Sequence, residues 1–395
     1  MKRITLALAI LAATGCGSTP QQKTTPAPQP ASYAPSYAFD MGSSPVGVIP
    51  SALVRDATRN KEVEVSIEYP TRGTGPFPII IFSPGYGGSS HAYEALISYW
   101  TSYGYVCIRP MHADAGKLRD TMNDLLQMKP EDRRPGHHDR TPQNPDKVAR
   151  TRPNLAEAIW DKEREPQWRD RVRDVTVIID SLDDLEKNYP ELAGKMDHTR
   201  IGVGGHSYGA FTAMLVGGAK TFGTPPVSGG DPRVKAILAM SPQGVAANRG
   251  LTAESWRDVH VPAMFMTGTR DYGANENESP DWRRTAYENS PAGDKYFVLI
   301  RNAGHMTFTG LASGLGQDQY ERPRDTPIVD PRTGQVLNAV PQANTGGGMV
   351  SDRGTFGSIR SISLMFWDSY LKNKADAKAL LDPAKYAGSV EFSRK

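Results

Sequence analysis

The sequence predicts an α/β fold in which helices cover both faces of a mostly parallel sheet. Apolar runs of strand length alternate along the chain with helical segments, an order typical of parallel sheets. The run at residues 77–82 is apolar without interruption, as expected of a strand that is buried on both faces. The chain contains no internal repeat and no second apolar block of domain size, which indicates one folded domain at residues 46–395.

The expected elements follow one another from residue 46. Residues 62–68 alternate apolar and polar side chains, as in a half-exposed strand, and the buried strand at 77–82 comes next. The chain then alternates between helices and strands: helix 91–103, strand 105–109, helix 171–187, strand 200–204 and helix 208–215. The last expected elements are strands 234–240, 261–266 and 296–300 and an amphipathic helix at 358–371.

Two segments interrupt this alternation. Residues 117–173 contain 25 charged side chains among 57 residues, with prolines scattered between them, and we interpret them as a charged insertion that is either a solvated excursion or a lid. Residues 307–355 are rich in Gly, Pro, Asp and Gln, and we interpret them as a loop-rich excursion.

The first 15 residues have the pattern of a secretory signal peptide. Two basic residues precede an apolar stretch at 4–13 that is too short to span a bilayer. The small residues before Cys16 resemble a bacterial lipobox, in which the cysteine becomes the lipidated first residue of the mature protein. An ordinary signal peptide cleaved nearby is the alternative. Residues 16–45, rich in Thr, Gln, Ala, Ser and Pro, are expected to form a flexible tether behind the lipid.

Charge and cysteine content exclude several classes of protein. Lys and Arg number 46 against 43 Asp and Glu, so the net charge is only +3, which argues against a nucleic-acid partner. The two cysteines, Cys16 and Cys107, exclude a disulfide scaffold and a Cys-rich metal site. Cys107 stands in an apolar strand, where a cysteine behaves as a small core residue.

A nucleophile motif stands between an expected strand and an expected helix. Residues 205–209 read Gly-His-Ser-Tyr-Gly, which is G-x-S-x-G in the context that this motif requires. Glycines two positions either side of Ser207 permit a tight, strained turn that lifts the hydroxyl above the sheet. His206 is expected to pack or to form hydrogen bonds rather than to act as the base.

A serine needs a base to take its proton and a carboxylate to orient that base. Asp271 follows the strand at 261–266 and His305 follows the strand at 296–300, so both are expected at the same sheet edge as Ser207. Asp281 lies in the same inter-strand region and is the alternative acid.

The oxyanion formed during acyl transfer needs two hydrogen-bond donors. One is the backbone N–H of Tyr208, the residue after the nucleophile. The other is expected from the glycine-rich loop at 82–88, where Tyr86 is the candidate donor.

These motifs together resemble the α/β-hydrolase superfamily, and within it the branch of dienelactone-hydrolase-like proteins and platelet-activating-factor acetylhydrolases. The resemblance extends over about 46–381 and is carried by residues 75–78, 82–88, 104–106, 173–175, 205–209 and 304–305 and by the closing helix. It implies a serine esterase without a cofactor, with Ser207 as nucleophile, His305 as base and Asp271 as acid. Pro84 departs from the histidine common in that branch, and Ser207 departs from the cysteine of true dienelactone hydrolases.

We therefore expect a serine hydrolase that cleaves a small-molecule or polymeric carboxylic ester through an acyl-serine intermediate. A polyester or cutinase-like hydrolase, a peptidase and a non-catalytic envelope binding protein are the alternatives. The signal sequence and Cys16 predict export across the inner membrane and a lipid anchor in the bacterial cell envelope. No metal is expected, because neither the adjacent histidines at 137–138 nor the oxygen-rich residues at 271–281 match a known ligand spacing.

Overall fold

The computed structural model describes residue 37 and residues 40–89, 92–115, 155–223, 226–273, 278–310, 353–386 and 390–395. Within them one sheet has nine strands in the order β1-β2-β4-β3-β5-β6-β7-β8-β9. The strands are β1 Val46–Asp56, β2 Lys61–Pro70, β3 Phe77–Ser83, β4 Val106–Met111, β5 Met196–His206, β6 Val234–Met240, β7 Ala263–Arg270, β8 Lys295–Gly304 and β9 Val390–Arg394. The predicted signal peptide and Cys16 lie outside the described residues.

The centre of the sheet is parallel and its two margins are antiparallel. Strands β3 to β8 all run in one direction, whereas β2 pairs antiparallel with β1 and β4, and β9 pairs antiparallel with β8. The helices are α1 Glu94–Ser102, α4 Leu155–Asp180, α5 Leu182–Asn188, α6 Tyr208–Val216, α7 Pro280–Glu288, α8 Arg353–Leu371 and α9 Ala375–Leu380. Short 3-10 turns are η1 Pro190–Leu192, η2 Ala247–Arg249, η3 Ala253–Trp256, η4 His305–Thr309 and η6 Pro383–Lys385.

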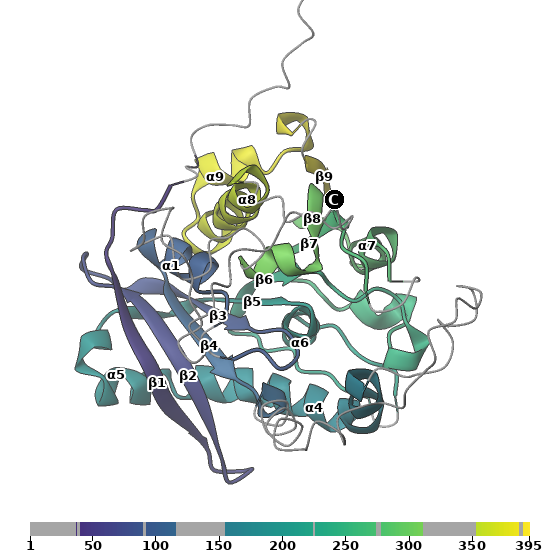
Figure 1. Cartoon of the computed structure of the whole chain (residues 1–395). Helices are drawn as coiled ribbons and strands as arrows, with labels where there is room; N and C mark the ends of the chain where they lie inside the picture. Colours follow the sequence, from purple (N-terminus) through teal and green to yellow (C-terminus); the bar gives the residue numbers. More distant parts are fainter. Residues whose placement is uncertain are drawn as a thin grey trace, which may run out of the picture.

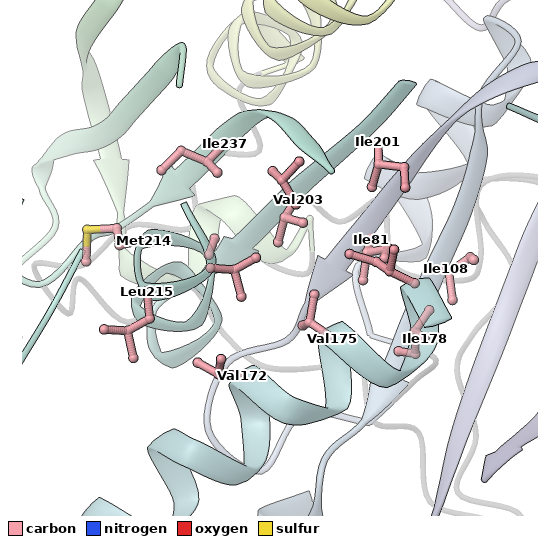
Figure 2. Close-up of a cluster of buried hydrophobic side chains, with 14 of the residues drawn as sticks. Ile81, Ile108, Val172, Val175, Ile178, Ile201, Val203, Met214, Leu215 and Ile237 are labelled. Carbon is pink, nitrogen blue, oxygen red and sulfur yellow. The ribbon is translucent and has the colours of Figure 1, made fainter. Parts of the chain in front are cut away.

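The sheet is the middle of three layers, which confirms the predicted fold class (Figure 1). On one face, α4 and α6 pack on apolar side chains of the central strands, and Figure 2 shows Val175 and Ile178 of α4 against Ile81 and Ile108 of the sheet. On the other face, α1 and α8 form a second apolar cluster with the strands. Because both faces are covered, the central strands consist of almost continuous apolar runs.

Helix α4 begins at Leu155, whereas the sequence pattern predicts a helix that starts only at residue 171. Charge density and Pro166 argue against a helix in residues 155–170, yet the backbone continues through them. Gln167, Trp168 and Arg171 are buried, so the end of the expected charged insertion packs against the sheet layer instead of lying in solvent. Residues 116–154 and 311–352, which include most of the expected insertion at 117–173 and of the expected excursion at 307–355, lie outside the described residues.

Two strands at the margins were not expected from the pattern. β1 carries exposed apolar side chains, Val48 and Leu53, and a register shift between Ile49 and Ala52, so its alternation is irregular. β9 has only five residues. No helix among the described residues is both long enough and apolar enough to cross a membrane.

Candidate active site

Ser207 stands on a sharp turn between β5 and α6. Its backbone has φ 55° and ψ −116°, a strained conformation for a residue with a side chain. The two flanking glycines permit very close backbone contacts. A Cβ on Gly209 would lie 1.8 Å from the carbonyl oxygen of Ser83, and one on Gly205 would lie 2.2 Å from the carbonyl oxygen of Gly209. The turn therefore holds Ser207 directly beside the end of β3.

The structure brings Ser207, His305 and Asp271 into one hydrogen-bonded chain. Ser207 Oγ lies 3.0 Å from His305 Nε2, and His305 Nδ1 lies 2.8 Å from Asp271 Oδ1. The three residues follow β5, β8 and β7, which are parallel, so the fold delivers them to the same edge of the sheet. This arrangement can transfer the serine proton to the imidazole while the carboxylate orients the ring.

Asp271 is fully buried and surrounded by donors. The hydroxyls of Ser241 and Thr267 donate to its Oδ2 at 2.5 and 2.7 Å, and Arg283 Nη2 lies 3.1 Å from its Oδ1. Burial acts to raise the pKa of Asp271, but the hydrogen bond from His305 and the charge of Arg283 outweigh it and lower the pKa to about 2. The carboxylate therefore stays ionised beside the imidazole at neutral pH.

The loop after β3 lies against the start of α6, where the side chains of the two residues that carry the candidate oxyanion donors come close together. The rings of Tyr86 and Tyr208 are 6.1 Å apart, and Tyr208 is the first residue of α6. Three neighbouring amides of the loop are engaged elsewhere: Gly85 N donates to Tyr93 Oη, Gly87 N to Asp114 Oδ2 and Gly88 N to Gly85 O.

Residues 46–222 match the family model of platelet-activating factor acetylhydrolase, isoform II. The matched region contains β1 to β5, the loop after β3, the sharp turn at residues 205–209, called the elbow below, and α6. Residues 46–222 are thus similar to a family of the α/β-hydrolase superfamily, and the nine-stranded sheet is consistent with an α/β-hydrolase fold. The match is consistent with the acetylhydrolase-like branch of this superfamily and indicates a hydrolase that acts on esters. No curated protein matches the chain significantly.

Of the two candidate acids, Asp271 and not Asp281 contacts His305. Asp281 is exposed in the first turn of α7. His206 is buried next to His305: its Nδ1 lies 2.8 Å from Tyr93 Oη and its ring centroid lies 4.7 Å from that of His305. Burial and the neighbouring His305 lower the pKa of His206 to about 3, so its imidazole stays neutral.

The sequence did not single out the residues that hold Asp271 and the loop after β3. Ser241 directly follows β6, Thr267 lies within β7, Arg283 comes from α7, and Arg171 comes from α4. The only sequence signal for Ser241 and Thr267 was that each directly follows one of the expected strands, 234–240 and 261–266. Nothing in the local pattern distinguished Arg171 and Arg283 from other arginines in charged helices.

The metal candidates of the sequence lie outside the described residues or are otherwise engaged. Residues 137–138 are not described, and Asp271 is bonded to His305. Among the described residues, one group of metal-type ligands gathers at the amino end of β5, Asp183, Glu186 and His198. His198 directs Nδ1 toward Asp183 at 3.3 Å and Nε2 toward Glu186 at 3.5 Å.

Proposed function

We propose that this protein is a serine esterase that cleaves carboxylic esters through an acyl-Ser207 intermediate. The observation that carries the proposal is the chain of hydrogen bonds from Ser207 Oγ through His305 to the buried Asp271. A hydroxyl in this arrangement loses its proton to the imidazole as it attacks a carbonyl carbon. The family match, which indicates an ester-acting hydrolase, supports the same reaction class.

In acylation, Ser207 Oγ bonds to the ester carbonyl carbon while His305 Nε2 takes its proton. The carbonyl oxygen becomes an oxyanion, which the backbone N–H groups of Tyr86 and Tyr208 are proposed to bind. His305 then returns the proton to the leaving alkoxide, and the ester C–O bond breaks. In deacylation, water repeats these steps, and the acid and the free Ser207 are formed.

Exposed apolar side chains beside the triad support an ester with an apolar group. Tyr272 follows Asp271 and Met306 follows His305 in the chain, and both side chains are more than half exposed. Val245, in the loop after β6, is a third exposed apolar side chain. Burying such surface under an acyl or alcohol group contributes about 25 cal/mol per Å².

The test is the Ser207→Ala variant. We expect this variant to fold as the native protein does and to lose turnover of a short-chain p-nitrophenyl ester, because the nucleophile is gone. Native protein should also be labelled rapidly by a fluorophosphonate, which reacts only with an activated serine. Full activity in the Ala variant would contradict the triad assignment, and a native protein that neither turns over esters nor reacts with the probe would contradict the esterase proposal as a whole.

We further propose that Cys16 carries the lipid anchor and that the enzyme works at the bacterial cell envelope. The support for this proposal is the sequence pattern of residues 1–16. A Cys16→Ser variant should move from the membrane fraction to the soluble envelope fraction. An unchanged distribution would exclude the anchor.

A further inference from the structure

A buried arginine lies directly behind the loop that follows β3. Arg171, on α4, is only 1% exposed. Its Nε and Nη2 donate to Asp114 at 3.0 and 2.6 Å, its Nη1 donates to the carbonyl of Pro84 at 2.8 Å, and its Nη2 donates to that of Gly85 at 3.1 Å. One planar guanidinium thus binds a buried carboxylate and two successive loop carbonyls, a task for which the shorter ammonium of lysine lacks the geometry.

Asp114 fixes the other side of the same loop. Its Oδ2 accepts a hydrogen bond from the backbone N–H of Gly87 at 2.8 Å. Arg171 therefore holds the carbonyl before Tyr86, while Asp114 holds the amide after it. The Arg171–Asp114 ion pair therefore holds the backbone on both sides of Tyr86, the candidate for the second oxyanion donor.

The bond to Gly85 determines where the Tyr86 amide points. The carbonyl of Gly85 and the N–H of Tyr86 belong to the same planar trans peptide unit, in which the two groups point in opposite directions. A guanidinium held on the carbonyl side directs the N–H away from Arg171. The positive guanidinium that donates to this carbonyl oxygen also polarises the peptide unit, which makes the N–H of Tyr86 a stronger hydrogen-bond donor.

Arg171 also contacts the residue that supplies the first donor. Its guanidinium lies 4.2 Å from the ring centroid of Tyr208, and the Tyr208 hydroxyl lies 3.4 Å from Gln167 Oε1, one turn earlier on α4. A cation over an aromatic ring attracts it, and the attraction is stronger when both groups are desolvated. One side chain of α4 therefore touches the peptide of one candidate donor and the side chain of the other.

A second Ser-His-Asp chain supports the same loop without being a second active site. Ser83 Oγ lies 2.9 Å from His112 Nε2, and His112 Nδ1 lies 2.9 Å from Asp174 Oδ2. All three side chains are at most 1% exposed, so no substrate carbonyl can reach Ser83. Asp174 also pairs with Lys61, which ties the end of β3 to α4 and β2. This chain anchors the strand end from which the loop starts.

We propose that Arg171 and Asp114 are positioning residues for the oxyanion hole, which orient the Tyr86 amide from behind the loop. This inference rests on the proposed esterase function. Neither side chain touches the substrate. Their effect is exerted on the tetrahedral intermediate, so their loss should lower kcat and leave KM nearly unchanged.

The experiment compares Arg171→Lys with the matched control Arg173→Lys. Arg173 stands two residues further on the same helix and pairs with Asp56 and Asp180, away from the loop. We expect Arg171→Lys to lower kcat by about 10²-fold, the size of effect seen when one oxyanion donor is lost. The inhibition constant of a trifluoromethyl ketone, which mimics the tetrahedral intermediate, should rise by a similar factor. Arg173→Lys should leave both quantities within about twofold.

Hydrogen exchange of the peptide that covers residues 83–89 gives a readout independent of turnover, because its amides should exchange faster in Arg171→Lys and not in Arg173→Lys. If Arg171→Lys does not fold, the Asp114→Asn variant tests the positioning role instead. We expect its kcat to fall about tenfold, because the negative charge that fixes the Arg171 guanidinium is lost.

The outcomes separate this inference from the esterase proposal. A folded Arg171→Lys enzyme with native kcat and native inhibitor affinity, or an equal loss in the Arg173→Lys control, overturns the positioning role while the esterase stands. Native protein without ester turnover overturns both.

Discussion

Asp271 shows how the surroundings of one residue determine its chemistry. The hydrogen bond from His305, the charge of Arg283 and the hydroxyls of Ser241 and Thr267 keep it ionised, and the carboxylate in turn orients the His305 imidazole. We expect Asp271→Asn to lower kcat by about 10⁴-fold, because an amide in that place favours the wrong imidazole tautomer. Steady-state kinetics on a p-nitrophenyl ester measure the loss.

The matched control is Asp281→Asn, at the exposed carboxylate that the sequence left as the alternative acid. This variant should keep native kcat and KM. A large loss in Asp281→Asn, or a small one in Asp271→Asn, would reverse the assignment of the acid.

At the same scale, the places of Ser207, Asp271 and His305 at one sheet edge could be predicted from the sequence, whereas the side chains that support them could not. Ser207 is marked by its motif, and Asp271 and His305 by their places after strands in the required order. Arg171 and Arg283 become significant only when α4 and α7 pack against the loops, because their partners are backbone carbonyls and carboxylates distant in sequence.

Among the contacts between elements, the one between the elbow and the end of β3 leaves the least room for a side chain, because a Cβ on Gly209 would lie 1.8 Å from the carbonyl oxygen of Ser83. We expect Gly209→Ala to destabilise the protein by about 1–3 kcal/mol, the usual cost of overpacking. Activity should fall as well, because the new Cβ would press on the carbonyl of Ser83 and displace the loop that carries Tyr86. Thermal unfolding and ester turnover measure the two effects.

Gly230→Ala is the control for this substitution. A Cβ at Gly230 meets its nearest heavy atom at 3.5 Å, an ordinary contact, and the residue lies outside the site. Equal losses of stability in the two variants would show that the contact with β3 is not the cause.

The elements that the sequence failed to predict share a physical reason. The parallel strands have long apolar runs because they are buried on both faces, whereas β1 and β9 lie at the margins and carry mixed patterns. The early start of α4 was missed because tertiary packing of Gln167, Trp168 and Arg171 overrides a poor local pattern.

For the whole molecule, the buried neutral His206 makes stability depend on pH. The pKa of His206 is about 3 in the folded protein against an ordinary 6.5. Between these values the unfolded chain binds a proton that the folded protein does not, so the stabilising contribution is complete above about pH 6.5 and falls as the pH drops toward 3. The slope from one such group is at most about 1.4 kcal/mol per pH unit.

We expect His206→Asn to reduce this slope, because an amide has no proton to gain in this range. Urea unfolding at several values between pH 7 and pH 4 gives the free energy of unfolding of both proteins. Parallel curves for the two proteins would contradict the prediction.

The position of β9 also has a consequence for the order in which the chain can fold during synthesis. β9 covers the open side of β8, the strand that ends at His305, but it is separated from β8 by a long stretch of chain. A nascent chain that has just emerged beyond His305 already contains Ser207, Asp271 and His305, yet β8 still presents unpaired backbone groups. Among the described strands, β9 is therefore the last to leave the ribosome, and it closes the sheet next to the strand that ends before His305.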